Sequence, residues 1–315
     1  MSTKPYLLNA VLISITVCTL AFAYIGKGMW SYPPLIENYS YTTSAERAYN
    51  HHRVAVFASY SPRGSIPEYV IYYLKELKKV SDVIIFIADN PLHPSEADKI
   101  KDLVDHIECR RHGEYDFGSY KRGLAYLRAN LLLDKQDSLI LANDSCYGPI
   151  FPLSPILNRM DQEMDADFYG LISNTEYNYH LQSYFLVFSP KILRTTDLDN
   201  FLSHIRKEDS KIEIIKKYEV GLTTHLTALG YRSKSYVPDT IKTDSEQDIR
   251  WNKLSFPNTL IIKYHFPFIK RYNFSPDQEL NEKPTEALNS IRVLNPELWA
   301  IIKSDIFFKA LVSKF

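Results

Sequence analysis

The stretch Leu139-Ile-Leu-Ala-Asn-Asp-Ser-Cys-Tyr-Gly-Pro149 decides the expected fold. Its first four residues form a short apolar run typical of a buried strand, and Gly148-Pro149 turns the chain afterwards. The polar residues Asn143, Asp144 and Ser145 therefore follow the carboxyl end of this strand. In sheets of parallel strands, ligands bind beyond the carboxyl ends. The stretch is thus a candidate ligand site, although a turn-capping Asp is the alternative interpretation of Asp144.

Apolar runs alternate with helical patterns on both sides of this stretch. We expect strands over residues 54–59, 82–88, 106–110, 138–142, 168–172 and 184–188, and helices over residues 66–79, from 95, 117–133, 198–204, 219–229 and 297–315. Because strands that alternate with helices need crossover connections, they give a mostly parallel sheet flanked by helices. The predicted class is therefore α/β. The last helix has an apolar and a lysine-bearing side, so it either packs on the domain or lies on a membrane.

The beginning of the chain is apolar. Tyr6–Ile25 contains no charged side chain, and about 20 helical residues just span a bilayer core. We expect an N-terminal transmembrane helix within residues 1–30 that anchors the chain. A signal peptide cleaved near Ala21-Phe22-Ala23 and a buried helix are the alternatives. The remaining divisions are a linker over 31–51, a globular domain over 52–272 and an amphipathic helical segment over 273–315.

Composition excludes several classes of protein. The chain has 37 basic and 37 acidic residues, so it lacks the basic excess of a nucleic-acid binder, and we expect no nucleic-acid partner. Its three cysteines are widely spaced and odd in number, which indicates free thiols in a reducing compartment. The sequence has no P-loop, nucleophile elbow, HExxH or dinucleotide fingerprint.

A second candidate element is Tyr115-Asp-Phe-Gly-Ser-Tyr-Lys-Arg-Gly-Leu124. Asp116 and Gly118 lie where a loop enters a helix, and Lys121 and Arg122 follow within the next turn. Backbone amides at a helix start, together with cations, suit a diphosphate. Capping by Asp116, with both cations in solvent, is the alternative.

Further polar residues precede predicted elements in the second half. His180, Gln182 and Ser183 lead into the strand over 184–188, although a lone His is more often structural. Glu219 lies at a predicted helix start, where its carboxylate is either a cap or a general base for a hydroxyl.

Two more candidates lie at other strand and turn positions. Ser59 ends the predicted strand over 54–59, at the edge where ligands are expected. The stretch Lys263-Tyr-His-Phe-Pro-Phe-Ile-Lys270 places His265 and Lys270 among aromatic residues. It either closes over a diphosphate or is a packed proline turn.

Several of these segments, in this order, resemble the rhamnan synthesis protein F family of bacterial polysaccharide-building proteins. The matching stretches are VAVFAS, YDFGSYKRGL, LILANDSCYGPIFPL, HLQSYFLVF, YEVGLTTHLTALGY and FPFIKR, which span about residues 52–272. The resemblance implies a variant of the GT-A glycosyltransferase fold, with a nucleotide-binding and an acceptor-binding half. Residues 52–272 would then be a catalytic domain that takes sugar from a nucleotide-diphospho-sugar.

The resemblance also implies roles for single residues. Asp116 to Arg122 corresponds to the donor-side helix, and Asn143-Asp144-Ser145 occupies the place of the usual Asp-x-Asp motif. Glu219 falls where inverting members carry the catalytic base. Donor-binding residues would be Ser59, Asp116, Gly118, Arg122, Asn143, Asp144 and Ser145; residues at the acceptor or donor sugar would be His180, Gln182 and Ser183; residues at the diphosphate would be Lys121, His265 and Lys270.

One departure from the family pattern leaves the cofactor open. Asn-Asp-Ser offers one carboxylate where Asp-x-Asp offers two. Either Asp144 binds Mn²⁺ or Mg²⁺ together with His265 or water, or Lys121, Arg122 and Lys270 replace the metal.

The expected activity is transfer of a sugar, with rhamnose expected from the family name, to a growing glycan such as O-antigen, capsule or rhamnan. The expected partners are a nucleotide-sugar donor, a glycan or lipid-linked glycan acceptor, and the membrane. Because nucleotide sugars are cytoplasmic in bacteria, the anchor would cross the inner membrane once and leave the catalytic domain inside. The rivals are a non-catalytic glycan-binding or assembly subunit, and an enzyme that transfers a phosphoryl or phosphosugar group.

Overall fold

The computed structural model describes residues 39–42, 53–133, 137–163, 165–243, 245–275 and 278–312. The predicted anchor over residues 1–30 lies outside the described residues, as does most of the predicted linker. No helix in the described part of the chain is both long and apolar enough to cross a lipid bilayer.

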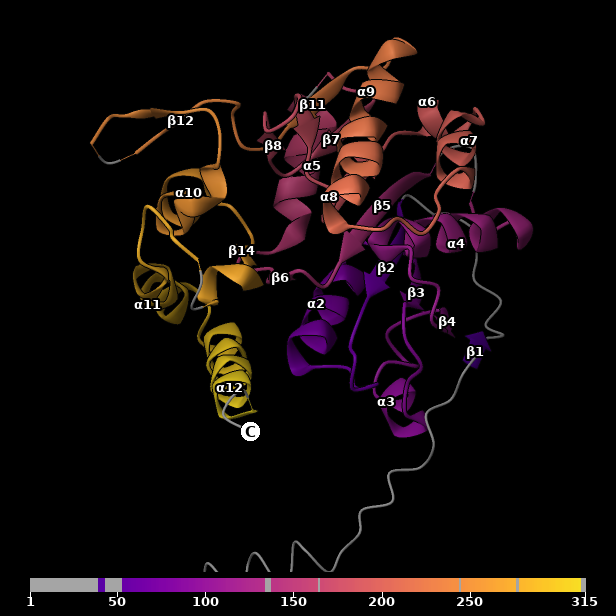
Figure 1. Cartoon of the computed structure of the whole chain (residues 1–315), viewed down its shortest axis with the longest axis horizontal. Coiled ribbons are helices and arrows are strands. Elements are labelled where there is room, and N and C mark those ends of the chain that lie inside the picture. Colours follow the sequence, from indigo (N-terminus) through magenta and orange to yellow (C-terminus); the bar gives the residue numbers. More distant parts are fainter. Residues whose placement is uncertain are drawn as a thin grey trace, which may run out of the picture. The chain divides into compact units, whose positions relative to one another are not determined.

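An eight-stranded sheet forms the centre of the domain (Figure 1). Its strands, in spatial order, are β1 (Tyr39–Thr42), β4 (His106–Cys109), β3 (Val83–Ala88), β2 (Arg53–Ser59), β5 (Ser138–Asn143), β10 (Phe185–Phe188), β7 (Phe168–Gly170) and β11 (Ser233–Ser235). Strands β4, β3, β2 and β5 are parallel, and β7 and β11 are parallel to each other. Strand β10 runs antiparallel between β5 and β7, and β1 is antiparallel to β4. The predicted mostly parallel sheet is therefore confirmed.

Helices cover both faces of the sheet, which explains why β3 is apolar and buried along its whole length. The core on one face joins alternate residues of β2 to α4 (Tyr115–Ala129), α6 (Pro190–Leu193) and α7 (Asp197–Ser203). Helix α4 approaches the sheet closely at Gly123, where a Cβ atom would lie 2.3 Å from Val56 Cγ1.

The core on the other face packs β2 and β3 against α2 (Glu68–Lys78), α3 (Pro94–Asp98) and α5 (Leu153–Glu163). The last helices α10 (Pro257–Tyr264), α11 (Pro284–Leu294) and α12 (Pro296–Val312), drawn in orange to yellow in Figure 1, pack on one another in turn, and α12 reaches α2. Leu298 and Ile302 of α12 are fully buried. Packing on the domain, one of the two predicted placements of the last helix, is therefore observed.

The helix that carries Glu219 differs from its prediction. It begins at Lys211 and continues as α8 (Lys211–Ile214), the π-helical η1 (Ile215–Val220) and α9 (Gly221–Ala228). The predicted start at Glu219 is wrong because Ser210 caps the helix earlier, its Oγ accepting from the Glu213 amide at 3.3 Å. Glu219 instead lies in a π-helical turn, a feature frequent at functional sites.

Short strand pairs complete the fold beside the main sheet. They are β6 (Cys146–Tyr147) with β14 (Ile269–Lys270), β8 (Ser173–Asn174) with β9 (His180–Leu181), and β12 (Ile241–Lys242) with β13 (Asp248–Ile249). Two short 3₁₀ helices, η2 (Lys253–Ser255) and η3 (Arg271–Phe274), flank α10 and β14. The first two pairs place side chains around the cavity described below.

Candidate active site

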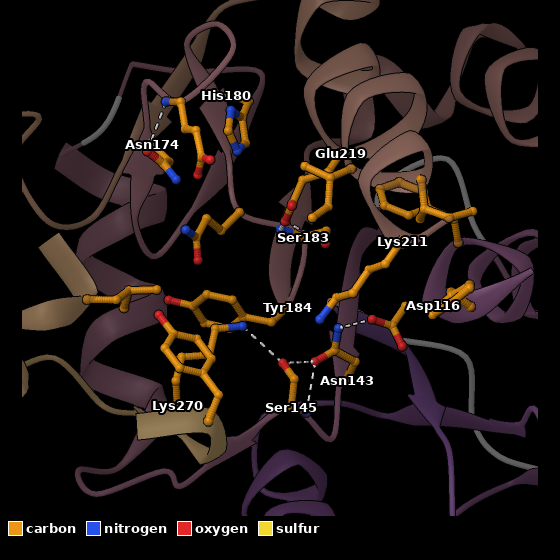
Figure 2. Close-up of a pocket in the computed structure, with 18 of the residues that line it drawn as sticks. Asp116, Asn143, Ser145, Asn174, His180, Ser183, Tyr184, Lys211, Glu219 and Lys270 are labelled. Carbon is orange, nitrogen blue, oxygen red and sulfur yellow. Dashed lines mark hydrogen bonds between the residues drawn. The ribbon is translucent and has the colours of Figure 1, made fainter. Parts of the chain in front are cut away.

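A cavity of about 410 Å³ lies beyond the carboxyl end of β5. Its wall combines the first turn of α4, the β8–β9 hairpin, the α8–η1 helix and the segment after β14 (Figure 2). The cavity thus lies at the edge of the sheet where ligands are expected to bind. Pockets of a few hundred Å³ with a few convergent polar groups are typical small-molecule sites.

The floor of the cavity consists of hydrogen-bonded polar side chains. Asn143 Nδ2 donates to Asp116 Oδ2 at 2.7 Å, and Asn143 Oδ1 accepts from the Ser145 hydroxyl at 2.6 Å and the Ser145 amide at 3.0 Å (Figure 2). All three residues line the cavity. The structure therefore brings the two elements predicted from separate parts of the sequence into one network.

Glu219 lies on another wall of the same cavity. Its Oε1 accepts from the Ser183 amide at 2.7 Å and the Ser183 hydroxyl at 2.8 Å. Ser183 is itself held by Tyr120 of α4, whose hydroxyl donates to the Ser183 carbonyl oxygen at 2.9 Å. These bonds fix one carboxylate oxygen and orient the group, as a general base requires.

His180 and Gln182 lie on the β9 side of the cavity. The His180 ring is buried, with Nδ1 2.8 Å from the Asn178 carbonyl oxygen. A proton on Nδ1 would be donated to that oxygen, which leaves Nε2 as an acceptor. Together with Ser183, these predicted sugar-side residues face the same cavity as Glu219.

Lys270 brings a positive charge to the floor through a long-range strand pair. Strand β14 pairs antiparallel with β6, so that Lys270 is opposite Cys146. Lys270 Nζ donates to Ser145 Oγ at 3.0 Å and lies 3.9 Å from the centre of the Tyr184 ring. Gly148 permits this approach, because a Cβ there would lie 2.3 Å from a ring carbon of Phe268.

Arg271 follows and connects two cavities. Its Nη1 donates to the Asp144 carbonyl oxygen at 3.0 Å, and its guanidinium lies 4.5 Å from the centre of the Tyr69 ring. Its Nε is buried and has no acceptor among the described residues. Arg271 lines both the first cavity and a second one of about 670 Å³ between the loop after β2 and helix α12, which also includes Tyr60.

Asp144 and Ser59 lie beside the first cavity rather than in its lining. Asp144 Oδ2 accepts from the Ser59 hydroxyl at 2.8 Å and the Tyr60 amide at 3.0 Å. Within the described residues, no group of three or more His, Cys, Asp or Glu could hold a metal ion. The Asn-Asp-Ser motif supplies one carboxylate, already bonded, beside an amide and a hydroxyl that bond each other, with the Asp116 carboxylate and Lys270 adjacent. The motif's own donors therefore do not make up the oxygen set of a resident Mn²⁺ or Mg²⁺ ion.

Lys121 and Arg122 do not line the cavity. Lys121 Nζ donates to the Ile205 carbonyl oxygen at 2.8 Å, and Arg122 pairs with Glu114 and donates to the Gly118 carbonyl oxygen at 2.8 Å. Lys121 thus joins α4 to the residues after α7, whereas Arg122 bonds to the first turn of its own helix.

Gly118 and His265 are likewise outside the cavity lining. A Cβ on Gly118 would lie 2.4 Å from Glu114 Cβ, so this glycine serves close packing at the start of α4. His265 is exposed at the end of α10, with φ of 49° and its ring beside Phe151.

The charge of Asp116 depends on its surroundings. Burial raises the pKa of Asp116 to about 7, and the Asp144 and Glu219 carboxylates act in the same direction, whereas Lys270 and Lys211 oppose them. The carboxyl group therefore titrates near neutral pH. Perturbed acids in clefts are candidates for functional groups.

Among the lining residues that sequence reasoning missed are Tyr184, Lys211 and Arg271. Arg271 directly follows the predicted Lys270, and Tyr184 directly follows Ser183, so proximity in sequence was an available signal. Lys211 is the first residue of α8 and extends toward Asn143 in Figure 2. The cap at Ser210 was its only local signal.

Comparison with curated proteins finds distant relatives. The chain is 27% identical over 196 residues to the uncharacterized protein y4gN of Sinorhizobium fredii, covering 60% of this chain and 49% of that protein. It is 26% identical over 188 residues to virulence protein VirA of Vibrio anguillarum, covering 59% of each. The matches therefore span only about half of each relative's length, or slightly more.

Solved structures with a similar arrangement include a 4-diphosphocytidyl-2C-methyl-D-erythritol synthase, at 14% identity and a TM-score of 0.39 over 68% of this chain and 100% of that one. Another is the glycosyltransferase GlyE of Streptococcus pneumoniae TIGR4, at 11% identity and a TM-score of 0.40 over 83% of this chain and 64% of that one.

A family model gives the firmest assignment. The model for rhamnan synthesis protein F matches residues 84–295, which is more than half of the chain. The match includes α4, β5, the β8–β9 hairpin, Glu219 and β14, and so every wall of the first cavity. The resemblance seen in the sequence motifs is confirmed: the chain belongs to the rhamnan synthesis protein F family.

Proposed function

We propose that this protein is a glycosyltransferase that moves a sugar from a nucleotide-diphospho-sugar to a hydroxyl of a growing cell-surface polysaccharide. Family membership supports a glycosyltransferase-like role in polysaccharide synthesis. The observation that carries the proposal is the convergence of Glu219, the Asn143–Ser145 floor and the cations Lys270 and Arg271 on one cavity.

The reaction divides between two walls of the cavity. Glu219, held through Oε1 by Ser183, would accept the acceptor's hydroxyl proton at its other oxygen. The acceptor oxygen would then attack the anomeric carbon of the donor sugar as the bond from that carbon to the diphosphate oxygen breaks. A single displacement of this kind inverts the anomeric centre.

The leaving diphosphate gains negative charge as this bond breaks, so it needs positive charge nearby. Lys270 Nζ and the Arg271 guanidinium supply it at the floor, and Lys211 adds a third cation from α8. These fixed cations would perform the role that a metal performs elsewhere.

The finer identity of the substrates is part of the proposal. We take dTDP-rhamnose as the first donor to test, since the family is described by rhamnan synthesis. The acceptor would be a lipid-linked glycan at the cytoplasmic face of the bacterial inner membrane. The charge-free segment Tyr6–Ile25 supports this single-pass placement.

A ligand screen followed by a transfer assay tests the function. A thermal-shift screen over nucleoside diphosphates and their sugars, with and without Mn²⁺, should raise the melting temperature for the correct donor, because a ligand that binds only the folded state stabilises it. Mass analysis should then find one added sugar on the acceptor. A donor that binds but is never cleaved would indicate a non-catalytic subunit, and an added phosphosugar would indicate a different transferase.

A further inference from the structure

The rim of the first cavity carries an unusual concentration of exposed aromatic rings. Tyr115, Tyr177 and Tyr272 line this cavity and are 45%, 52% and 41% exposed. Among the described residues, the only other exposed tyrosine is Tyr60, which lies beneath the guanidinium of Arg111. Three of four exposed tyrosines thus surround one opening, although none of them is needed to fill the core.

These rings come from three separate elements. Tyr115 begins α4, Tyr177 lies between β8 and β9, and Tyr272 belongs to η3. Tyr115 and Tyr177 have positive φ values of 56° and 67°, a conformation that bulky residues rarely adopt. Such backbone outliers gather at ligand sites, where the surrounding structure holds them in place.

Polar groups lie between the rings. Asn174, Glu176 and Gln182 line the same cavity, with the Asn174 amide oxygen accepting from the Glu176 amide at 3.0 Å. Lys216 Nζ lies 4.7 Å from the centre of the Tyr177 ring, where it can fix the ring's orientation. Apolar ring faces alternating with amide and carboxylate groups match a pyranose, whose C–H faces are apolar and whose hydroxyls are donors and acceptors.

We propose that Tyr115, Tyr177 and Tyr272 form the binding site for the acceptor saccharide. Sugar rings stack on the tyrosine faces at the opening, and their hydroxyls bond to the amides between them. The terminal sugar then presents a hydroxyl to Glu219, which lines the same cavity. This inference rests on the proposed glycosyltransferase function and assigns its acceptor side.

The test measures saccharide binding separately from donor chemistry. The full chain and its Tyr177→Ala, Tyr272→Ala and double variants are titrated with methyl glycosides of a rhamnose and a glucose trisaccharide. A Trp251→Ala variant is the matched control, because Trp251 is 69% exposed and lies outside the lining of this cavity. Each single variant should weaken binding of the trisaccharide about two- to tenfold, and the double variant more, whereas the control should not.

Two further measurements identify what the rings contact. Tyr177→Phe should bind the trisaccharide nearly as well as the wild type, because it keeps the ring face. Affinity for the nucleotide-sugar donor should be unchanged in every variant.

Some outcomes overturn the inference. If neither trisaccharide binds the wild type, or if the double variant binds as well as the control, the tyrosines are not a saccharide site. A parallel loss of donor affinity would assign the rings to the nucleobase instead. A wild type that binds trisaccharide but no nucleotide sugar would refute the proposed transferase and leave the saccharide site standing.

Discussion

Replacing Glu219 by Gln removes the base and leaves its scaffold almost intact. In the wild type, both bonds from Ser183 end on one oxygen, Oε1. The amide oxygen of Gln can accept the same two bonds, so the amide nitrogen takes the position of the other carboxylate oxygen, which would accept the proton in the wild type. The variant should therefore fold normally, with a melting temperature close to that of the wild type.

The expected loss in transfer rate is that of removing general-base catalysis. A general base contributes about 10²–10⁴-fold, which corresponds to about 3–5 kcal/mol in the activation free energy. Ser183→Ala gives a graded comparison. It deletes the hydroxyl bond and keeps the amide bond, so about 0.5–1.5 kcal/mol, or a two- to tenfold loss of rate, is expected.

Single-turnover transfer with saturating donor and acceptor measures the chemical step, and titration with the nucleoside diphosphate measures donor binding. Glu219→Gln should lose at least about a hundredfold in transfer rate and keep its donor affinity. Turnover within about tenfold of the wild type, in a folded variant, would remove Glu219 from the role of base. A parallel loss of donor affinity would indicate that the carboxylate organises the cavity instead.

Three other perturbations test the floor of the cavity. Lys270→Ala should weaken binding of a nucleoside diphosphate about tenfold or more in calorimetry. Lys303→Ala, at an exposed lysine of α12 outside the lining of the first cavity, should not; equal losses would contradict the diphosphate assignment. Asp116 has a folded pKa raised to about 7, so its contribution to the free energy of unfolding should decrease as the pH rises toward and through 7. Asp116→Asn should abolish that pH dependence in thermal melts. An unchanged profile would show that Asp116 is not the titrating group. Gly148→Ala should cost about 1–3 kcal/mol and loosen diphosphate binding, because its new Cβ meets a ring carbon at 2.3 Å. Gly230→Ala, also at positive φ but with nothing within 4 Å of its Cβ, should keep that binding unchanged; similar binding losses would refute the packing argument.

The strands were predictable because their sequence pattern is local. The runs 54–58 and 139–142 are apolar throughout, and β2 and β5 are buried along nearly their whole length between two helical layers. The polar residues after β5 were predictable for the same reason, since a strand end fixes where the next side chains emerge. The predicted start of the helix at Glu219 is wrong because the helix is capped by Ser210, nine residues earlier.

Lys121 and Arg122 were assigned to the diphosphate because they follow Asp116 closely in sequence. The geometry of the helix turns them away from it. At about 100° per residue, Lys121 and Arg122 point about 140° and 120° away from Asp116, in opposite rotational senses. Their observed partners are the Ile205 carbonyl oxygen and Glu114, and neither cation lines the cavity that Asp116 lines. Helical periodicity alone could have shown that these three side chains do not converge.

Lys270 presents the reverse case, because it is 125 residues from its partner Ser145. Only the pairing of β14 with β6 brings the two together, and that pairing depends on the space left by Gly148. The same pairing places Arg271 against the Asp144 carbonyl oxygen. The presence of these two cations therefore accounts for the missing second carboxylate of the Asn-Asp-Ser motif. A carboxylate in place of Ser145 would favour a metal ion there. The Ser145 hydroxyl instead accepts from Lys270 and leaves the positive charge of Lys270 available to an anion.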